Sequence, residues 1–210
     1  PPPRRSWGGG LVFGQIDGGG IDASHPDIAG RVVNIDREVV SNCEYISSHA
    51  TGVIGTVMGS GLGDPAAQGM APEAGLAALW SFCGDPIGKL HDNAALFDLS
   101  NHSYGSDAGW RAEGGVWTWL GTTPFGRYDG DSWQLDETVQ SQGAAAFFAA
   151  GNETGSGPED APEARPRDCG DDRDCLLAYG VAKNAFVIGG LSNIHVTEGS
   201  GLVGLDPLGM

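Results

Sequence analysis

Three side chains in this sequence have the types and positions that acyl transfer requires. Asp17 ends the apolar run LVFGQID, His49 stands near the start of SHATGVIGTVMG, and Asn152 ends the apolar run AAAFFAAGN. An aspartate can orient a histidine that acts as a general base, and an asparagine amide can donate to a developing oxyanion. We therefore take Asp17, His49 and Asn152 as candidate catalytic residues.

The glycines that follow Asp17 allow a second interpretation. The stretch 18–23 satisfies the loose dinucleotide-binding pattern G-x-G-x-x-G/A, and Asp36 lies near the spacing expected for a ribose-binding acid. Such a site needs a helix of about three turns directly after the glycines, to hold a pyrophosphate at its N-terminus. Pro26 would fall inside that helix, and little chain remains before the next predicted strand at 31–36. We therefore favour the Asp–His interpretation and keep a nucleotide-binding α/β enzyme as the weaker alternative.

The elements that must position these residues alternate along the chain. We expect helices at 48–59, with Ser48 as the candidate N-cap, and at 132–143, with Trp133 in its apolar spacing and Gly143 as the C-cap. Continuous apolar runs bounded by turn residues predict strands at 11–17, 31–36, 76–80, 96–103, 144–152 and 184–192. This alternation predicts an α/β fold with a mostly parallel sheet that is covered on both faces. In such a sheet the carboxyl ends of the strands display their residues in one crevice.

Two stretches do not follow the alternating pattern. Residues 106–131 mix Gly, Trp, Asp and Pro, and residues 153–174 are acidic and rich in proline. We expect both to be surface insertions in a single domain that spans residues 1–210.

The composition excludes several classes of partner. The chain has 210 residues and a formal net charge of −16, with only two lysines, which argues against binding to nucleic acid or to an anionic membrane. No apolar run reaches the roughly 18 residues that a membrane-spanning helix needs.

The four cysteines are compatible with an exported protein but do not prove export. Cys169 and Cys175 flank a polar loop and predict a local disulfide, whereas Cys43 and Cys83 are either a second bridge or two free thiols. The chain opens PPPRR without a Met or a signal peptide, and it ends at Met210 without a tail or cap signal. We therefore expect both ends to be cut rather than natural.

Six segments, in order along residues 11–192, resemble those of the subtilisin-like serine peptidases. VFGQIDGGGIDASHPDIAGRV is similar to their aspartate segment, and SSHATGVIGTVMG is similar to their histidine segment. AQGMAPEAGLAAL resembles their G-x-A-P-x-A turn, and LSNHSYG resembles their substrate-binding edge segment. AFFAAGNE resembles their oxyanion-asparagine segment, and GVAKNAFVIGGLS resembles the strand that follows it. The order Asp then His is also that of subtilisin.

The resemblance implies a fold, a reaction and a role for each matching residue. It implies a three-layer α/β fold and a secreted serine endopeptidase that hydrolyses polypeptides through an acyl-enzyme. Asp17 would orient His49, His49 would be the general base, and Asn152 would donate to the oxyanion. The substrate backbone would pair with Ser103, Tyr104 and Gly105. The walls of the specificity pocket would be formed by Ala149, Ala150 and Gly151.

The sequence departs from the family pattern at the nucleophile. The G-T-S-x-A-x-P segment is absent, and Ser200 in EGSGLVG lacks the Ala and Pro that should follow. The resemblance therefore implies a catalytic domain whose C-terminal part, with its serine, lies beyond Met210, so that the chain as given is inactive. A non-catalytic, peptide-binding descendant of the same fold is the alternative.

We expect no cofactor for catalysis. The carboxylates around Asp129 and Asp131, or those within 153–174, would suit a structural calcium ion, which many relatives carry. His91 and Asp92 lack a second ligand pair at useful spacing, so we do not expect a metal site there.

Overall fold

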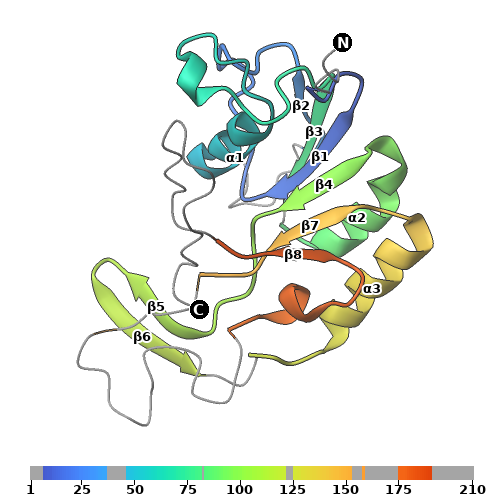
Figure 1. Cartoon of the computed structure of the whole chain (residues 1–210). Coiled ribbons are helices and arrows are strands. Elements are labelled where there is room, and N and C mark those ends of the chain that lie inside the picture. The colour runs from blue at the N-terminus through green and yellow to red at the C-terminus, as the bar shows by residue number, and fades with distance from the viewer. Residues whose placement is uncertain are drawn as a thin grey trace, which may run out of the picture. The chain divides into compact units, whose positions relative to one another are not determined.

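The main feature of the computed structural model is a six-stranded sheet with the order β2-β3-β1-β4-β7-β8 (Figure 1). The structure describes residues 7–36, 46–81, 83–121, 125–152, 158 and 175–190. The strands of this sheet are β1 (Val12–Asp17), β2 (Val32–Asn34), β3 (Leu76–Ser81), β4 (Leu99–His102), β7 (Ala146–Ala149) and β8 (Phe186–Ile188). β1 pairs in parallel with both β3 and β4, and β2 pairs in parallel with β3. The predicted α/β fold with a mostly parallel sheet is confirmed.

Helices cover both faces of this sheet. α1 (Ser48–Met58) lies on one face, and α2 (Pro86–Asn93) and α3 (Gly130–Gln142) lie on the other (Figure 1). Apolar residues fill the space between α1 and the sheet, and they are Phe13, Ile21, Ile28, Val32, Ala50, Ile54, Met58, Ala74 and Ala77. On the opposite face of β1, a Cβ at Gly14 would meet the Phe97 ring at 2.8 Å, so only glycine admits this ring.

The chain divides into two compact units. The first contains Pro1–Tyr104, Gln134–Phe147 and Asn184–Phe186, and the second contains Gly105–Trp133, Phe148–Lys183 and Val187–Met210. In the second unit, Ala108, Phe125 and Leu177 form a small core of their own. That the whole chain is one domain stays a prediction.

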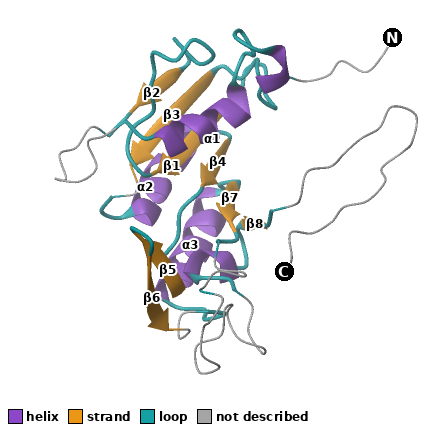
Figure 2. Cartoon of the chain, turned by 90° about the vertical axis from the view of Figure 1, so that its left-hand side faces the viewer, coloured by secondary structure: helices purple, strands orange, loops and turns teal. Residues whose placement is uncertain are grey.

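The insertion at 106–131 contains a β-hairpin that we did not predict. β5 (Gly109–Glu113) and β6 (Val116–Gly121) pair antiparallel as a separate two-stranded sheet (Figure 2). Gly114 and Gly115 form the turn with φ values of 57° and 80°, which two-residue hairpin turns require. The adjacent glycines were therefore a hairpin signal in the sequence. The second predicted insertion, 153–174, lies outside the described residues except for residue 158.

Two predicted helix details were wrong. The N-cap of α1 is Ser47 rather than Ser48, because Ser47 has extended backbone and its Oγ accepts from the Ala50 N–H at 3.1 Å. In α3, Trp133 is 58% exposed and does not join the inward face. That face is polar in part, since the buried Asp136 carboxylate accepts from the Asn184 N–H at 2.7 Å.

The strand predicted at 96–103 begins later than expected, because helical structure precedes it. Asp85 caps α2 by accepting from the Gly88 N–H, and Pro86 occupies the first turn. A 3-10 helix at Ala94–Leu96 then carries the chain to β4. The remaining 3-10 helices of the described chain are Pro65–Ala67 and Ala178–Val181.

The other predicted strands are present but shorter at one or both ends, except for the strand at 76–80, which extends to Ser81 as β3. β2 is limited to three residues because only Val32–Asn34 find partners on β3. The two described cysteines, Cys83 and Cys175, are both in disulfides, so Cys83 is not a free thiol. Cys169, the predicted partner of Cys175, and Cys43 lie outside the described residues. No helix in the described part of the chain has the length and apolar character of a membrane span.

One arginine joins the loops around the α1 face of the first unit. The Arg31 guanidinium donates to the carbonyl of Asp27 at 2.6 Å and to that of Met58 at 2.7 Å. It also donates to the carbonyl of Pro72 at 2.8 Å and to that of Ala74 at 3.4 Å. Arg31 thereby satisfies backbone acceptors from three separate segments, and this fastens the end of α1 to the loop before β3.

We expect Arg31→Met to lower the free energy of unfolding by about 2–4 kcal/mol, since several part-buried carbonyls lose a charged donor. Chemical denaturation of the wild type and the variant measures the difference. The matched control is Arg111→Met, because Arg111 pairs only with exposed carboxylates, those of Asp107 and Glu113. Equal effects of the two substitutions would show that the backbone contacts of Arg31 contribute nothing specific.

Candidate active site

The candidate site is built on a buried carboxylate at the end of β1. Asp17 is the last residue of the strand, and its side chain is 2% exposed. Its Oδ1 accepts from the Gly18 N–H at 2.7 Å and lies 2.8 Å from Nδ1 of His49. The predicted contact between Asp17 and His49 is therefore present.

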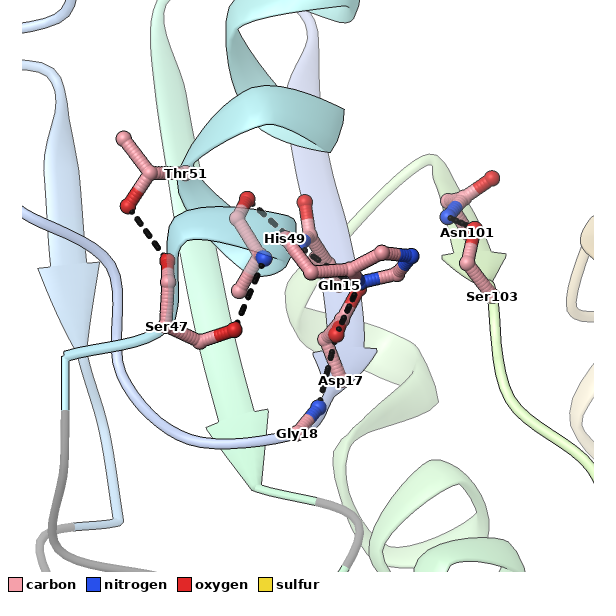
Figure 3. Close-up of polar contacts among 9 residues, drawn as sticks. Gln15, Asp17, Gly18, Ser47, His49, Thr51, Asn101 and Ser103 are labelled. Carbon is pink, nitrogen blue, oxygen red and sulfur yellow. Dashed lines mark hydrogen bonds and ion pairs between the residues drawn. The ribbon is translucent and has the colours of Figure 1, made fainter. Parts of the chain in front are cut away.

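His49 is displayed by the first turn of α1. Ser47 caps this turn, and its own N–H donates to the carbonyl of Gly20 at 2.8 Å, which ties the helix start to the loop after β1. The His49 side chain is 59% exposed, in contrast to its buried partner. Figure 3 shows the imidazole lying over the end of β1, with Nδ1 directed at Asp17.

This geometry assigns a role to each ring nitrogen. An ionised carboxylate can only accept, so Nδ1 carries the proton and donates it to Asp17. Nε2 then holds the lone pair on the exposed side of the ring, where it can take a proton from a nucleophile. The pair has the chemical form of a histidine base and its orienting acid.

Two polar side chains whose contacts we did not predict, those of Thr51 and Gln15, join β1 and the loop after it to the His49 helix. The Thr51 hydroxyl donates to the Ser47 carbonyl at 2.8 Å and accepts from the Asp22 N–H at 3.0 Å. Gln15, which is fully buried on β1, donates to the Ala50 carbonyl at 3.0 Å. The signal for Gln15 was a polar residue two positions before Asp17 inside an apolar run, hence on the same strand face.

The first predicted substrate-binding segment follows β4. Ser103 comes directly after the strand, and its Oγ accepts from Nδ2 of Asn101 at 2.8 Å (Figure 3). The Tyr104 hydroxyl lies 3.0 Å from Nδ1 of His102. Gly105 opens the second compact unit.

The second predicted segment lies in that unit with Asn152. Ala149 ends β7, and the Ala150 N–H donates to the Ile188 carbonyl at 2.9 Å. Gly151 has φ of 112°, a conformation that L side chains rarely adopt, so glycine is required immediately before Asn152. The approach of Asn152 to His49 stays a prediction, because the two residues belong to different units.

The dinucleotide interpretation is wrong on two counts. No helix follows the glycines after β1, since residues 18–31 run through turns directly into β2. Asp36, the proposed ribose acid, forms an ion pair with Lys89 and accepts from the Ser81 N–H at 2.7 Å. The helix N-terminus and the free carboxylate that this interpretation required are both missing.

The structure describes one of the two candidate calcium positions, the one around Asp129 and Asp131. Asp129 Oδ1 accepts from the Asp131 N–H at 3.1 Å, at the start of α3, where it satisfies helix N–H groups. His91 lies 3.1 Å from the exposed Asp92 carboxylate. The described residues contain no group of three or more His, Cys, Asp or Glu side chains that could hold a metal ion. A structural calcium ion stays a prediction.

Comparison with known proteins identifies the family of the sequence. The subtilase family matches residues 9–201. No curated protein sequence matches the chain.

Three solved structures of proteases are similar to this chain. The MycP3 protease from the type VII (ESX-3) secretion system aligns with a TM-score of 0.50 at 18% identity, over 88% of this chain and 53% of its own. A serine-to-alanine mutant of the protease domain of PatA gives 0.49 at 20% identity, over 85% of this chain and 57% of its own. The serine protease of Aeromonas sobria gives 0.47 at 23% identity, over 73% and 27%. The chain thus spans less than two thirds of each of these proteins, and the likeness to MycP3 supports the fold.

His102 provides a pH-dependent contribution to stability beneath the Ser103 segment. It is fully buried between Ser100, whose Oγ lies 2.9 Å from Nε2, and the Tyr104 hydroxyl. Burial lowers the pKa of His102 from 6.5 to about 3, because the charged ring would lose its hydration. The unfolded chain therefore binds a proton below pH 6.5 that the folded chain does not bind.

We expect this group to lower the free energy of unfolding by up to about 1.4 kcal/mol for each pH unit between pH 6.5 and pH 3, and to contribute no pH dependence above pH 6.5. In His102→Gln the slope should become shallower by this amount between pH 6.5 and pH 5. Urea denaturation at half-unit pH steps measures it. Parallel stability curves for the wild type and the variant would contradict the assignment.

Proposed function

Because the chain belongs to the subtilase family, we propose that its parent protein is a serine endopeptidase that cleaves polypeptides through an acyl-enzyme. The observation that carries this proposal is the 2.8 Å contact between the buried Asp17 carboxylate and Nδ1 of the exposed His49. A histidine held in this tautomer is prepared to accept the proton of a serine hydroxyl and later to pass it to the leaving amine.

In this proposal, the nucleophilic serine lies in a part of the protein outside these 210 residues. The support is that subtilases use a serine in a G-T-S-x-A-x-P segment, which the sequence does not contain. The chain also spans only 53% of the length of MycP3, the solved structure with a TM-score of 0.50. In the complete protein, His49 would lie between Asp17 on its Nδ1 side and the serine on its Nε2 side.

Substrate binding and oxyanion stabilisation complete the proposal. Ser103, Tyr104 and Gly105 would pair with an extended substrate backbone, and Ala149, Ala150 and Gly151 would wall the pocket for one side chain. Asn152 would donate its side-chain amide to the oxyanion. The positive φ of Gly151 supports this role, because it sets the direction in which the chain presents Asn152.

The family also supports a proposal for the cellular location of the protein. We propose a secreted or otherwise extracytoplasmic protein, which the disulfide-bonded Cys83 and Cys175 support, since reducing compartments disfavour such bonds. A structural calcium ion remains part of the proposal, and catalysis needs no cofactor.

The first test uses active-site labelling of the full-length protein. A fluorophosphonate should label the wild type, and His49→Ala should label and turn over a peptide substrate slower by several orders of magnitude, because no base activates the serine. The matched control is His91→Ala, since His91 also pairs with an aspartate, but on an exposed helix end. It should behave as the wild type.

Two outcomes would overturn the proposed function. A wild-type protein that binds peptides but shows neither labelling nor turnover would be a peptide-binding descendant. Equal labelling of the His49→Ala variant and the wild type would place the reactive serine in a different site.

The second test separates transition-state stabilisation from ground-state binding at Asn152. In the full-length protein, Asn152→Ala should lower kcat by a factor on the order of 100–1,000 with little change in KM, a magnitude carried over from subtilisin. Steady-state kinetics on one peptide substrate measures both constants. The control is Asn93→Ala, which removes an amide bonded only to the Lys89 carbonyl on α2. An increase in KM at constant kcat would make Asn152 a binding contact.

A further inference from the structure

Gln15 is a buried polar residue on the strand that carries the candidate acid. It lies two positions before Asp17 on β1, its side chain is on the same face as Asp17, and it is 0% exposed. On this face it lies between Phe13, which belongs to the apolar core under α1, and Asp17, and it is in register with Asn101 on β4. An apolar side chain would serve packing alone, so the amide needs a separate explanation.

The hydrogen bonds of Gln15 determine how its amide is oriented. Nε2 donates to the Ala50 carbonyl at 3.0 Å and lies 3.3 Å from Oδ2 of Asp17 (Figure 3). Both partners are acceptors, and rotating the amide would direct its oxygen at them. The NH₂ group must therefore face Asp17 and α1.

This orientation leaves the other end of the amide without a partner. Oε1 of Gln15 is the one buried side-chain oxygen or nitrogen in the described chain that accepts or donates no hydrogen bond. A buried acceptor without a donor destabilises the fold. Gln15 therefore keeps its contacts with Asp17 and α1 although the unpaired Oε1 at the other end of its amide destabilises the fold.

We propose that Gln15 is a positioning residue for the Asp17–His49 pair. It connects the strand that carries Asp17 to the residue that follows His49, since Ala50 is the next residue on α1. By occupying Oδ2, it leaves Oδ1 of Asp17 as the oxygen that meets His49. The catalytic role of this contact rests on the proposed function. The effect of Gln15 on the Asp17–His49 pair can be measured without an activity assay.

The donated hydrogen bond should also affect protonation of the pair. A donor at Oδ2 stabilises the Asp17 anion and draws charge away from Oδ1. Without it, the carboxylate holds a proton more tightly and attracts an imidazolium more strongly. Both changes act in the same direction, toward protonation of the pair at higher pH.

Other ionisable groups surround the end of β1 and must be considered. Asp22 lies in the following loop, Asp36 and Lys89 form an ion pair beside the end of β3, and His102 is on the adjacent strand β4. None of them is hydrogen-bonded to Asp17 or His49 in the described chain. They are unchanged by a substitution at Gln15, so a comparison of variants cancels their contribution.

The test is Gln15→Met in the full-length protein, since Met has a similar length and shape and carries no donor. The control is Gln68→Met, which makes the same chemical change at a residue whose amide bonds only the Ser60 carbonyl. The first measurement is the titration of the His49 ring by NMR, and the second is the pH profile of kcat/KM on a peptide substrate. Gln15→Leu serves as the second variant if Gln15→Met does not fold.

We expect the His49 titration and the acidic limb of kcat/KM to move to higher pH by about half a unit to one unit in Gln15→Met, and to stay in place in Gln68→Met. Unchanged His49 titration in folded Gln15→Met and Gln15→Leu would overturn the proposal and make Gln15 a core residue. A wild-type protein without peptidase activity whose His49 titration still shifts on substitution would reject the proposed function and keep the positioning role.

Discussion

The structure around the candidate site depends on the burial of one carboxylate. The Asp17 carboxylate is almost fully removed from water, which is unfavourable unless each oxygen is hydrogen-bonded. The Gly18 N–H and His49 share Oδ1, and the Gln15 amide faces Oδ2. These requirements place the turn after β1, the start of α1 and Gln15, two positions earlier on β1, within hydrogen-bonding distance of a single side chain. The position of His49 thus follows from the hydrogen bonds that the buried Asp17 carboxylate requires.

The remainder of the first unit holds these elements in register. Parallel pairing of β1 with β3 and β4 keeps Asp17 at the carboxyl edge of the sheet, where Ser81 and His102 also end their strands. Apolar side chains pack α1 against the sheet, and the Arg31 guanidinium bonds the carbonyl of Met58 at the end of the helix. The packing of α1 on the sheet therefore buries Asp17. Because Ser47 caps the helix near the end of β1, His49 stands in the first turn and stays exposed.

Much of this arrangement could be predicted from the sequence, and what was missed has identifiable physical causes. Continuous apolar runs located β1 and β3, and the Asp and His segments predicted the contact between their side chains. The sequence also contained local signals that we did not use. Gly114-Gly115 indicates a hairpin turn within the stretch that we judged by composition, and Asp85 before Pro86 indicates a helix start. Gln15 was harder, because its role depends on Ala50, which is 35 residues away and contributes only a carbonyl. Backbone acceptors have no signature in a sequence, and the same holds for the partners of Arg31.

The separation of 32 residues between Asp17 and His49 has a consequence for the order of assembly. The strands that flank Asp17 and the helix that carries His49 all lie before Tyr104, within the first continuous segment of the first compact unit. Closing so short a loop has a modest entropic penalty, and contacts at short range along the chain form early in folding. During synthesis the acid and the base can therefore meet before the downstream half of the domain has left the ribosome. In the proposed enzyme, the nucleophile would then dock onto an Asp17–His49 pair that is already formed, and reactivity would appear only as the last part of the fold closes.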